Sequence, residues 1–230
     1  MKKALVTGAT SGIGLEIAKK LVDMGYVVYG VGRDFSKVDF KNENFKLVVC
    51  DLIKYQNIEE MVRKLEDKEE IELLVNCAGV GYFAPHEEIN PSKLHKMIAL
   101  NLEAPLILTQ QLLRHIKKNQ GTIINIASIT AKKSSVFGCG YSATKAGLGH
   151  FSESLFDEVR KTGVKVVCIY PDITKTAFYD NLNFREGDDK LSYILPECVA
   201  SSVEMILSQR EGTVITQLVV QPQKHMIKKK

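Results

Sequence analysis

Short apolar runs alternate with stretches of helical periodicity along most of the chain. Seven runs are rich in β-branched residues and hold few polar positions: 3–8, 27–32, 46–51, 72–79, 122–128, 164–171 and 216–221. Between them, apolar residues recur every three or four positions over 14–25, 57–68, 91–118, 142–163 and 197–209. Strands without polar alternation are typical of a sheet covered on both faces. The pattern therefore predicts an α/β fold in three layers, a doubly wound parallel sheet of about seven strands with helices on both faces.

No linker, repeat or low-complexity segment divides the chain, so residues 1–230 are expected to form a single domain. The least periodic stretch, at about 177–195, is polar and comes late in the chain. Loops of this size often contact ligands, and we expect a substrate loop here. Residues 224–230, "KHMIKKK", are expected to be a solvated basic tail, with contact to a membrane surface or an acidic partner as the less favoured alternative.

Composition narrows the class of protein. Of 230 residues 45% are hydrophobic, which supports a sizeable core, and the formal net charge of +4 is too small to suggest nucleic acid. The five cysteines include no Cys-x-x-Cys pair, which is typical of a reducing compartment rather than a disulfide framework. Thr7, Gly8 and Glu16 interrupt the apolar segment that a signal peptide would need. These features predict a cytoplasmic protein that does not enter the membrane.

The turn after the first apolar run reads "TGATSGIG", Thr7 to Gly14. Glycines between a strand and a helix permit a tight reversal and a close approach of the backbone to a bound group. The free N–H groups and the positive dipole end of the following helix point to the same place. Gly8, Gly12 and Gly14 therefore predict a site for the diphosphate of a dinucleotide, with an ordinary glycine-rich turn as the alternative.

The second apolar run ends at Gly32 and is followed by Arg33 and Asp34. Folds that bind NAD place a carboxylate near this position for the adenosine ribose, whereas an arginine suits the 2′-phosphate of NADP. We therefore expect NADP, with NADPH as its reduced form. NAD remains the alternative because Asp34 lies close by, and an isolated Arg33 is also typical of a surface turn.

A tyrosine and a lysine stand four positions apart in "YSATK", Tyr141 to Lys145. On a helix this spacing puts both on one face, so the ammonium is expected to lower the pKa of the phenol from about 10. Such a pair alone is more typical of a helix surface. However, Ser128 ends the fifth apolar run, and Asn101 lies in the helical stretch before it. Because the carboxyl ends of parallel strands share one sheet edge, these groups are expected to converge with the glycine turn.

Together these motifs resemble the short-chain dehydrogenase/reductase family, in its compact type with a T-G-x-x-x-G-I-G turn. The resemblance runs from Lys3 to about Pro222 and includes "NCAG", Asn76 to Gly79, where Cys77 replaces the usual second asparagine. It implies a Rossmann-like fold and an oxidoreductase (EC 1.1.1.-) that transfers a hydride between a nicotinamide and a carbonyl or secondary alcohol.

The resemblance also implies residue roles. Tyr141 would be the proton donor in reduction and the base in oxidation, and Lys145 would lower its pKa and hold the nicotinamide ribose. Ser128 would orient the carbonyl, and Asn101 would support a water that links Lys145 to solvent. The implied cofactor-binding residues are Gly8, Thr10, Ser11, Gly12, Ile13, Gly14, Arg33, Asp51, Leu52, Asn76, Ala78, Gly79, Tyr141, Lys145, Pro171, Thr174 and Thr176.

One position departs from the family pattern after the sixth apolar run. The family usually has P-G-x-x-x-T there, and this chain has "PDITKT", with Asp172 in place of glycine. The favoured interpretation is a tolerated turn residue. The alternative is a carboxylate near the nicotinamide edge that alters affinity for the charged oxidised ring.

The substrate is less well defined by the sequence. The resemblance places it against apolar side chains of two segments: Phe137, Cys139, Phe178, Tyr179 and Phe184. Arg185 is interpreted as solvated rather than as an anion contact, and Cys139 as a packing residue rather than a reactive thiol. A ketone or 3-oxoacyl compound is expected, without a metal, since the five histidines show no ligand spacing.

The helical stretches 91–118 and 142–163 carry more apolar surface than one sheet face needs. In similar proteins such helices pair across a twofold axis, so a homodimer or homotetramer is expected. Two other functions stay open: an NAD-dependent alcohol dehydrogenase, and a non-catalytic nucleotide-sensing regulator, which the complete set of catalytic motifs disfavours. An epimerase or dehydratase of the longer branch of this fold is disfavoured by the chain length.

Overall fold

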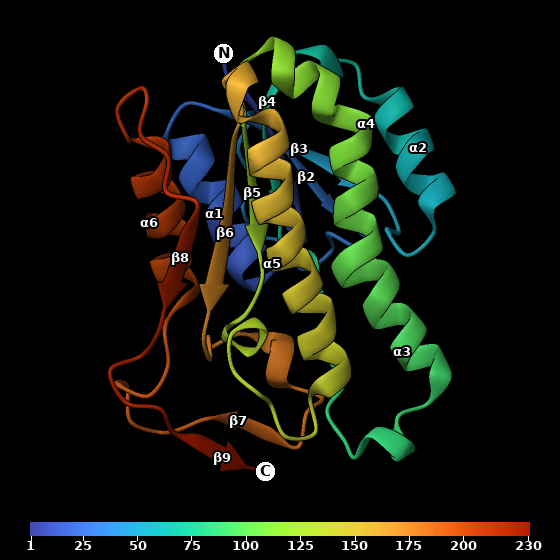
Figure 1. The fold of residues 1–230 in the computed structure, drawn as a ribbon, viewed down its shortest axis with the longest axis vertical. Helices are drawn as coiled ribbons and strands as arrows, with labels where there is room; N and C mark the ends of the chain where they lie inside the picture. The colour runs from blue at the N-terminus through green and yellow to red at the C-terminus, as the bar shows by residue number, and fades with distance from the viewer.

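All seven apolar runs form strands of one sheet in the computed structural model, which describes residues 1–230. The strands are β1 (Lys3–Thr7), β2 (Val27–Gly32), β3 (Phe45–Val49), β4 (Ile71–Asn76), β5 (Thr122–Ile126), β6 (Lys165–Pro171) and β8 (Gln217–Val220). Their order is β3-β2-β1-β4-β5-β6-β8, and every neighbouring pair is parallel. The predicted doubly wound α/β sheet is therefore confirmed (Figure 1).

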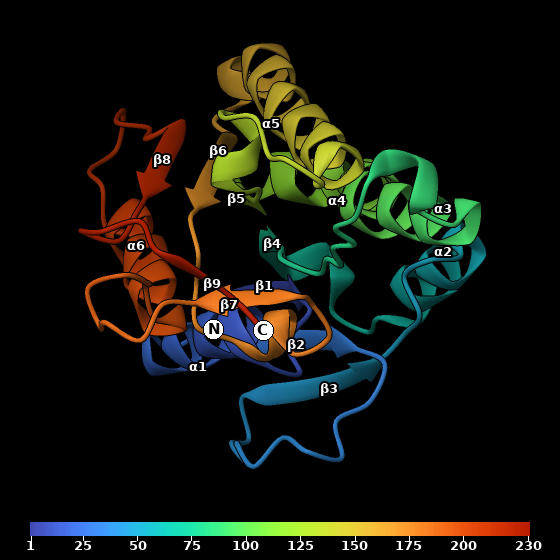
Figure 2. The same cartoon turned by 90° about the horizontal axis from the view of Figure 1, so that it is seen from below.

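Helices cover both faces of this sheet, which explains why its strands are apolar on both sides. One face packs against α1 (Gly12–Asp23) and α6 (Pro196–Leu207), and the other against α2 (Tyr55–Lys64), α4 (Ala104–Lys118) and α5 (Cys139–Val159) (Figure 2). Successive strand residues alternate between the two cores: Val6 and Val75 lie in the first, Leu5 and Leu74 in the second. Each such side chain stabilises the fold by about 1.5–3 kcal/mol.

The helical stretch predicted over residues 91–118 changes its winding at Asn101. α3 (Pro91–Ile98) and α4 are joined by a π-helical segment, Ala99–Glu103. α3 begins where Asn90 Oδ1 accepts a hydrogen bond from Ser92 N, with Pro91 in the first helical position. Insertions of this kind are frequent at functional sites. Here the insertion lies at Asn101, whose side chain is completely buried.

The strand order reverses between β1 and β4, and open α/β sheets bind ligands at such a reversal, beyond the carboxyl ends of the strands. The ends of the two strands are tied together by Thr7. Its Oγ1 accepts hydrogen bonds from the backbone N–H groups of Cys77 and Ala78 at 2.9 and 3.0 Å. The ends of β1 and β4, which border the crevice at the sheet centre, are therefore held in a fixed relative position.

A second, two-stranded sheet joins the substrate loop to the end of the sequence. β7 (Phe184–Glu186) pairs antiparallel with β9 (Ile227–Lys229), and the pair lies across the carboxyl ends of the large sheet (Figures 1 and 2). Residues 224–230 are exposed throughout, as predicted for a solvated tail, but they are ordered by this pairing.

None of the helices combines the length and the apolar character that crossing a membrane requires.

Candidate active site

The glycine-rich turn has the geometry that a close backbone approach requires. Gly8 and Gly12 have left-handed φ values of +70° and +53°. A Cβ at Gly14 would lie 2.3 Å from the Gly8 carbonyl oxygen, and a Cβ at Gly8 would lie 3.0 Å from backbone atoms of Ala78. Side chains at these positions would therefore collide with the walls of the crevice.

The N-terminus of α1 is open to an anion. Ser11 is the N-cap, but its side chain makes no capping hydrogen bond, and the first turn contains no acidic residue. The first N–H groups of a helix have no partner inside the helix, and the dipole makes this end positive. Thr10 and Ile13 lie in the same turn. The turn therefore fits the diphosphate of a dinucleotide.

The expected adenosine end of the site lies beyond β2 and β3. Arg33 is exposed there, while the Asp34 carboxylate folds back and accepts a hydrogen bond from Ser36 N at 2.8 Å. A Cβ at Gly32 would lie 2.2 Å from the methyl carbon of Thr10, so this position has no room for a carboxylate in the present arrangement. At the end of β3, Leu52 is buried, and Asp51 Oδ1 accepts a hydrogen bond from Ile53 N at 3.2 Å.

Three of the four predicted catalytic side chains lie together at the carboxyl end of β5. Tyr141 and Ser128 are 8% and 9% exposed, and the Ser128 side chain is close enough to Tyr141 to act on its pKa. Lys145 follows one turn later on α5, 4% exposed, with its ammonium 5.8 Å from the centre of the Tyr141 ring. The structure therefore brings these groups together as the spacing predicted, and their catalytic roles stay predictions.

The lowered tyrosine pKa expected from the lysine is not found. Burial raises the pKa of Tyr141 well above its ordinary value and outweighs the nearby Ser128 side chain, which acts in the opposite direction. Burial also lowers the pKa of Lys145 to about 8. Poorly solvated surroundings penalise the charged form of each group, and burial is the largest cause of both shifts. Tyr141 is consequently a protonated phenol at neutral pH in this structure.

The Lys145 ammonium has capacity for further acceptors. It donates a hydrogen bond to the Ile126 carbonyl oxygen at 2.9 Å and forms no ion pair. An ammonium has three N–H donors, and a buried one is stable only when hydrogen-bonded. The hydroxyl pair of a ribose supplies such acceptors. Lys145 therefore fits the nicotinamide ribose of the expected cofactor.

Replacing this buried lysine tests its ionisation directly. We expect Lys145→Met to stabilise the chain at pH 7 by roughly 2 kcal/mol, since burial of the ammonium opposes folding. The pKa of Lys145 is about 8 in the folded chain and 10.5 in the unfolded chain. The buried ammonium therefore destabilises the folded chain to its full extent below pH 8. Between these values the folded chain loses the proton first, and the wild type regains stability as the pH rises.

Urea unfolding at pH 7 and pH 10 measures this effect. The advantage of Lys145→Met should shrink at the higher pH, while Lys161→Met, at an exposed lysine, should show a small and constant difference. An advantage of the same size at both pH values would contradict the assigned ionisation.

Asn101 holds the chain beyond β4. Its Oδ1 accepts a hydrogen bond from Val80 N at 2.8 Å, and its Nδ2 donates to Val80 O and Thr144 Oγ1 at 2.8 and 3.1 Å. A Cβ at Gly79 would lie 3.3 Å from Asn101 Oδ1 and 3.4 Å from Lys145 Nζ. Because Gly79 has no side chain, a narrow space remains beside Asn101 and Lys145. Support of a water by Asn101 stays a prediction.

Asn76 lies inside the sheet in a buried polar chain. Its Nδ2 donates to Asn125 Oδ1 at 2.8 Å, and Asn125 Nδ2 donates to Ser152 Oγ at 2.8 Å. Asn76 Oδ1 is buried without a hydrogen-bond partner. Asn76 therefore links β4, β5 and α5. Sequence reasoning missed Asn125, whose signal is a polar residue inside an otherwise apolar strand.

Thr7 and Thr144 were also missed as supporting residues. Thr7 belongs to the quoted turn motif, but its contact with the end of β4 depends on the strand order. Thr144 lies inside "YSATK" and bonds Asn101, 43 positions away in sequence. No local pattern indicates either contact.

The segment after β6 reaches back to the glycine turn. Pro171 ends β6, and the buried Thr174 hydroxyl donates to the Asp172 carbonyl oxygen at 2.9 Å. A Cβ at Gly12 would lie 3.1 Å from the methyl carbon of Thr176. Thr176 therefore lies against the turn expected to hold the diphosphate, where a cofactor-binding residue is expected.

The Asp172 carboxylate has partners that neither sequence interpretation anticipated. Asp172 is 7% exposed, and its Oδ1 accepts a hydrogen bond from Ile173 N at 2.8 Å. Its Oδ2 accepts one from Gln221 Nε2 at 3.0 Å and lies 3.6 Å from His225 Nδ1. Asp172 is therefore joined to the last ten residues of the sequence.

Aromatic rings close over Tyr141. Phe83 and Phe178 have ring centres 5.3 and 6.0 Å from that of Tyr141. Phe184 lies 5.1 Å from Phe83 and 5.7 Å from Tyr179. The substrate loop therefore provides the apolar wall expected from Phe178, Tyr179 and Phe184, and Phe83 is an addition that the sequence analysis lacked.

Two other expectations for the substrate region need correction, and a third gains a detail. Cys139 is exposed, with its Sγ 3.3 Å from His86 Nδ1, so the expected packing role is wrong. Phe137 is 57% exposed with a φ of +64°, so it is no wall of the closed site. Arg185 is partly solvated as expected, but it also pairs with Asp188 at 2.9 Å.

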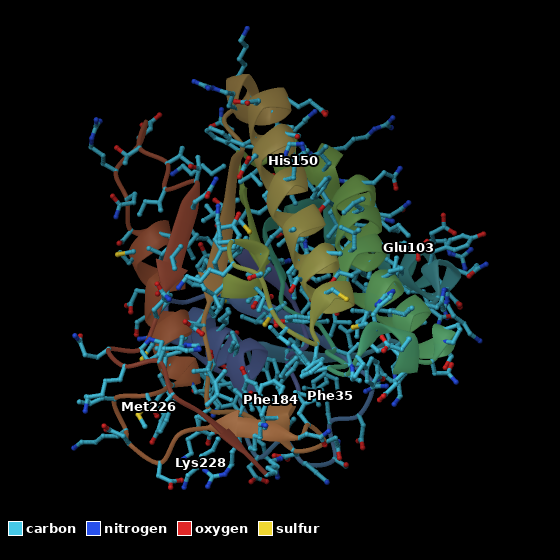
Figure 3. The ribbon with its side chains drawn as sticks, turned by 60° about the horizontal axis from the view of Figure 1, so that its bottom comes forward. Phe35, Glu103, His150, Phe184, Met226 and Lys228 are labelled. Atoms are coloured by element: carbon cyan, nitrogen blue, oxygen red, sulfur yellow. The ribbon has the colours of Figure 1, made fainter.

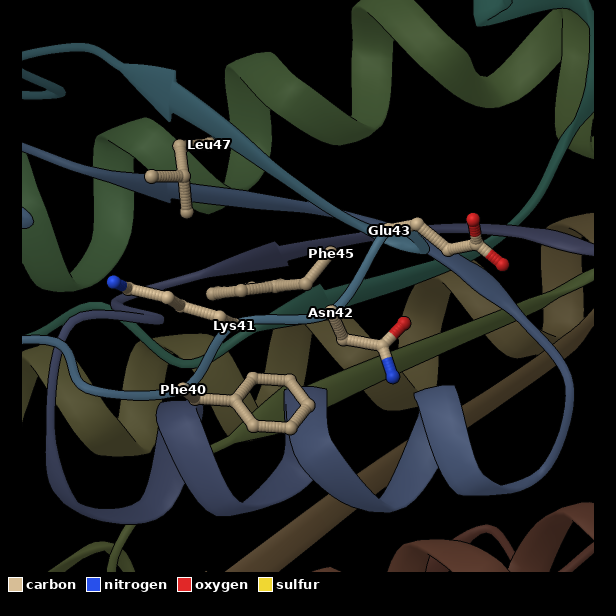
Figure 4. Close-up of a pocket in the computed structure, with 6 residues that line it drawn as sticks. All are labelled: Phe40, Lys41, Asn42, Glu43, Phe45 and Leu47. Carbon is tan, nitrogen blue, oxygen red and sulfur yellow. The ribbon is translucent and has the colours of Figure 1, made fainter.

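An open pocket lies elsewhere, at the start of β3 (Figure 4). It is lined by Phe40, Lys41, Asn42, Glu43, Phe45 and Leu47. These residues precede or begin β3, whereas the candidate site lies at the carboxyl ends of the strands. This pocket is therefore separate from the candidate active site.

The fold and the site define a dinucleotide-dependent oxidoreductase of the doubly wound α/β class. The chain belongs to the short chain dehydrogenase family, whose model matches residues 2–187. A nicotinamide dinucleotide is the cofactor that the glycine turn and Lys145 fit.

Named relatives cover nearly the whole chain. An uncharacterised oxidoreductase of Staphylococcus epidermidis is 31% identical over 96% of this chain and 97% of its own length. The 3-oxoacyl-[acyl-carrier-protein] reductase of Rickettsia prowazekii is 30% identical over 94% and 93%. Among solved structures, the closed form of a serine dehydrogenase complexed with NADP+ has a TM-score of 0.84 and 26% identity over 96% and 94% of the two chains.

Proposed function

We propose that this chain reduces a carbonyl group of a small ketone or 3-oxoacyl substrate, with NADPH as the preferred hydride donor. The observation that carries the proposal is the buried Tyr141 phenol, close to the Ser128 side chain and followed one turn later by Lys145, at the sheet edge that also carries the glycine turn. A bound nicotinamide supplies the hydride.

The residues of this chain supply the proton and the position. Ser128 holds the carbonyl oxygen beside the Tyr141 hydroxyl, and Tyr141 donates the proton. Burial keeps the pKa of Tyr141 high, so the phenol retains its proton at neutral pH. Lys145 holds ribose hydroxyls, and Asn101 keeps the neighbouring Val80 backbone in place.

The preference for NADPH rests on Arg33. Its guanidinium is exposed beyond β2 and available to a 2′-phosphate. Asp34 is the nearby carboxylate that kept NAD as an alternative. Its Oδ1 accepts a hydrogen bond from Ser36 N. Support also comes from the serine dehydrogenase complexed with NADP+.

The substrate class follows from the rings around Tyr141. Phe83, Phe178 and Phe184 offer apolar surface and few hydrogen-bond partners to a substrate. A site of this kind favours an apolar substituent next to the carbonyl. This supports ketones and 3-oxoacyl chains over small charged compounds, in agreement with the name of the Rickettsia prowazekii relative.

The test is NADPH oxidation across a panel of ketones, 3-oxoacyl thioesters and quinones, repeated with NADH. We expect turnover of apolar ketones or 3-oxoacyl thioesters with NADPH. Arg33→Ala should weaken NADPH affinity about tenfold or more and leave NADH affinity unchanged, because a charge-assisted contact is lost. Arg63→Ala, at an exposed arginine of α2, is the matched control.

Two outcomes would contradict this proposal. Equal use of both cofactors, unaffected by Arg33→Ala, would favour the NAD-dependent alcohol dehydrogenase. Tight NADPH binding without turnover of any carbonyl compound would favour the nucleotide-sensing regulator.

The assembly proposed from the sequence is a homodimer or homotetramer through the outer faces of α4 and α5. Leu113 on α4, with Phe151 and Phe156 on α5, is only partly buried by the chain itself. Apolar side chains at these places support pairing with a second copy.

A further inference from the structure

The last residues of the sequence are bound to the substrate loop along its length. Besides the pairing of β9 with β7, three backbone hydrogen bonds join the two segments. Lys224 N donates to Leu191 O at 2.9 Å, Gly187 N to Met226 O at 3.1 Å, and Lys230 N to Asn183 O at 2.9 Å. The contact therefore extends along the loop from residue 183 to residue 191.

Lysine side chains of the same segment reinforce this contact. Lys224 pairs with Asp189 at 2.8 Å, and Lys228 pairs with Asp188. These lysines hold the pKa values of both carboxyl groups below their ordinary range. Lys230 Nζ donates to the carbonyl oxygens of Tyr179 and Asp180 at 2.5 and 2.9 Å. Exposed ion pairs are individually weak, but here several of them and a strand act on one segment.

The loop that is held in this way carries rings of the candidate active site. Phe184 lies in β7 itself, opposite Lys229 of β9. Phe184 contacts Phe83 and Tyr179, and Phe83 contacts Tyr141. Figure 3 shows Phe184, Met226 and Lys228 on the same lower face of the molecule. A path of direct contacts therefore leads from β9 to the proposed proton donor.

Asp172 fixes the place where this segment leaves the large sheet. Gln221 follows β8 directly, and both Gln221 and His225 approach the Asp172 carboxylate. Glycine, the usual residue here in the family pattern, has no side chain to offer. Asp172, the residue that differs from the family pattern, is thus also the residue that contacts Gln221 and His225.

We propose that residues 221–230 are the outer support of the substrate site, holding the loop 177–191 so that its rings form a wall in front of Tyr141, with Asp172 as a positioning residue. The inference rests on the proposed function. A wall that is already ordered spares the substrate the entropy of ordering these side chains, and this strengthens binding. The chemistry at Tyr141, Ser128 and Lys145 involves no atom of the segment.

The first experiment compares the full chain with a chain that ends at Lys224. No residue after Val220 belongs to a hydrophobic core cluster, so the shortened chain is expected to fold. Thermal unfolding and NADPH affinity should stay close to those of the full chain. The KM for an apolar ketone should rise about tenfold, the effect of releasing two or three ordered side chains, while kcat changes little. An unchanged or lower KM would overturn the proposal.

Charge reversal tests the same idea in the full chain. Asp188→Lys places a positive charge against Lys228 and Arg185 and should raise KM, and adding Lys228→Asp should restore part of the loss. Asp157→Lys is the matched control, because Asp157 also pairs with an arginine three positions away but lies on α5. Failure of the second change to rescue the first, or an equal effect at Asp157, would overturn the proposal.

Salt gives a readout that a loss of stability alone would not produce. Exposed charges are screened within about 3 Å at 1 M salt. High salt should therefore raise the KM of the full chain more than that of the shortened chain, which keeps only the pair of Lys224 with Asp189. The same salt response in both chains would count against the support by lysines.

Hydrogen exchange separates this inference from the proposed function, because it needs no turnover. The Gly187 amide, bonded to Met226 O, should exchange slowly in the full chain and fast in the shortened one. Equal exchange in both would overturn the proposed support. A full chain that reduces no carbonyl compound, but in which Gly187 exchange still depends on residues 225–230, would overturn the proposed function and leave the support of the loop standing.

Discussion

Replacing Tyr141 with phenylalanine should reduce kcat about 10²–10⁴-fold while leaving NADPH affinity nearly unchanged. The phenyl ring keeps the contacts of Tyr141 with Phe83 and Phe178, so the packing of the site is retained. Only the hydroxyl that is proposed to donate the proton is lost. Steady-state turnover of the best substrate, together with NADPH fluorescence titration, measures the two quantities separately.

Tyr55→Phe is the matched control for this change. Tyr55 is 47% exposed at the start of α2, and loss of its hydroxyl should alter neither turnover nor cofactor affinity. Full activity of Tyr141→Phe would remove Tyr141 as the proton donor. A variant that no longer binds NADPH would instead indicate that the hydroxyl shapes the cofactor site.

Adding one methyl group at Gly14 should destabilise the chain by about 3 kcal/mol or more and abolish most NADPH binding. Gly14 lies in the first turn of α1, where alanine would ordinarily favour the helix. Its Cβ, however, would lie 2.3 Å from the Gly8 carbonyl oxygen and 3.1 Å from that of Thr7. Relief requires α1 to move away from β1, which would displace the helix end proposed to hold the diphosphate.

Gly25→Ala provides the comparison, measured by urea unfolding and NADPH titration. Gly25 has a φ of +85° and no atom within 4 Å of an added Cβ. Its change should lower stability by only about 1–2 kcal/mol, through backbone strain, and leave cofactor affinity intact. If Gly14→Ala proved as mild as Gly25→Ala, the tight contact between α1 and β1 could not be what holds the turn in place.

The sheet was predictable because strands buried on both faces leave a strong sequence signal. Leu5 and Val6 face different cores, so neither position tolerates a polar residue, and the run stays apolar. β9 was not predictable for the opposite reason. Its residues Ile227–Lys229 are all exposed and their pairing partner lies 43 positions earlier, so nothing local distinguishes this strand from a solvated tail.

The candidate site was predictable in position and less so in its electrostatics. Tyr141, Lys145 and Ser128 meet because a helix turn and a strand end fix their relative places. The direction of the Tyr141 pKa depends on how many rings exclude water, and those come from segments distant in sequence. The spacing of Tyr141 and Lys145 reveals their proximity but not their solvation.

Exposure of the Cys139 thiol offers a convenient handle for spectroscopy. Cys50 and Cys168 are buried and Cys77 is partly buried, which leaves Cys139 and Cys198 as the exposed thiols. With Cys198 changed to serine, a maleimide dye would attach at Cys139, two positions before Tyr141 and beside the His86 ring. Such a fluorophore would report occupancy of the neighbouring site in real time, without any need for a coloured product.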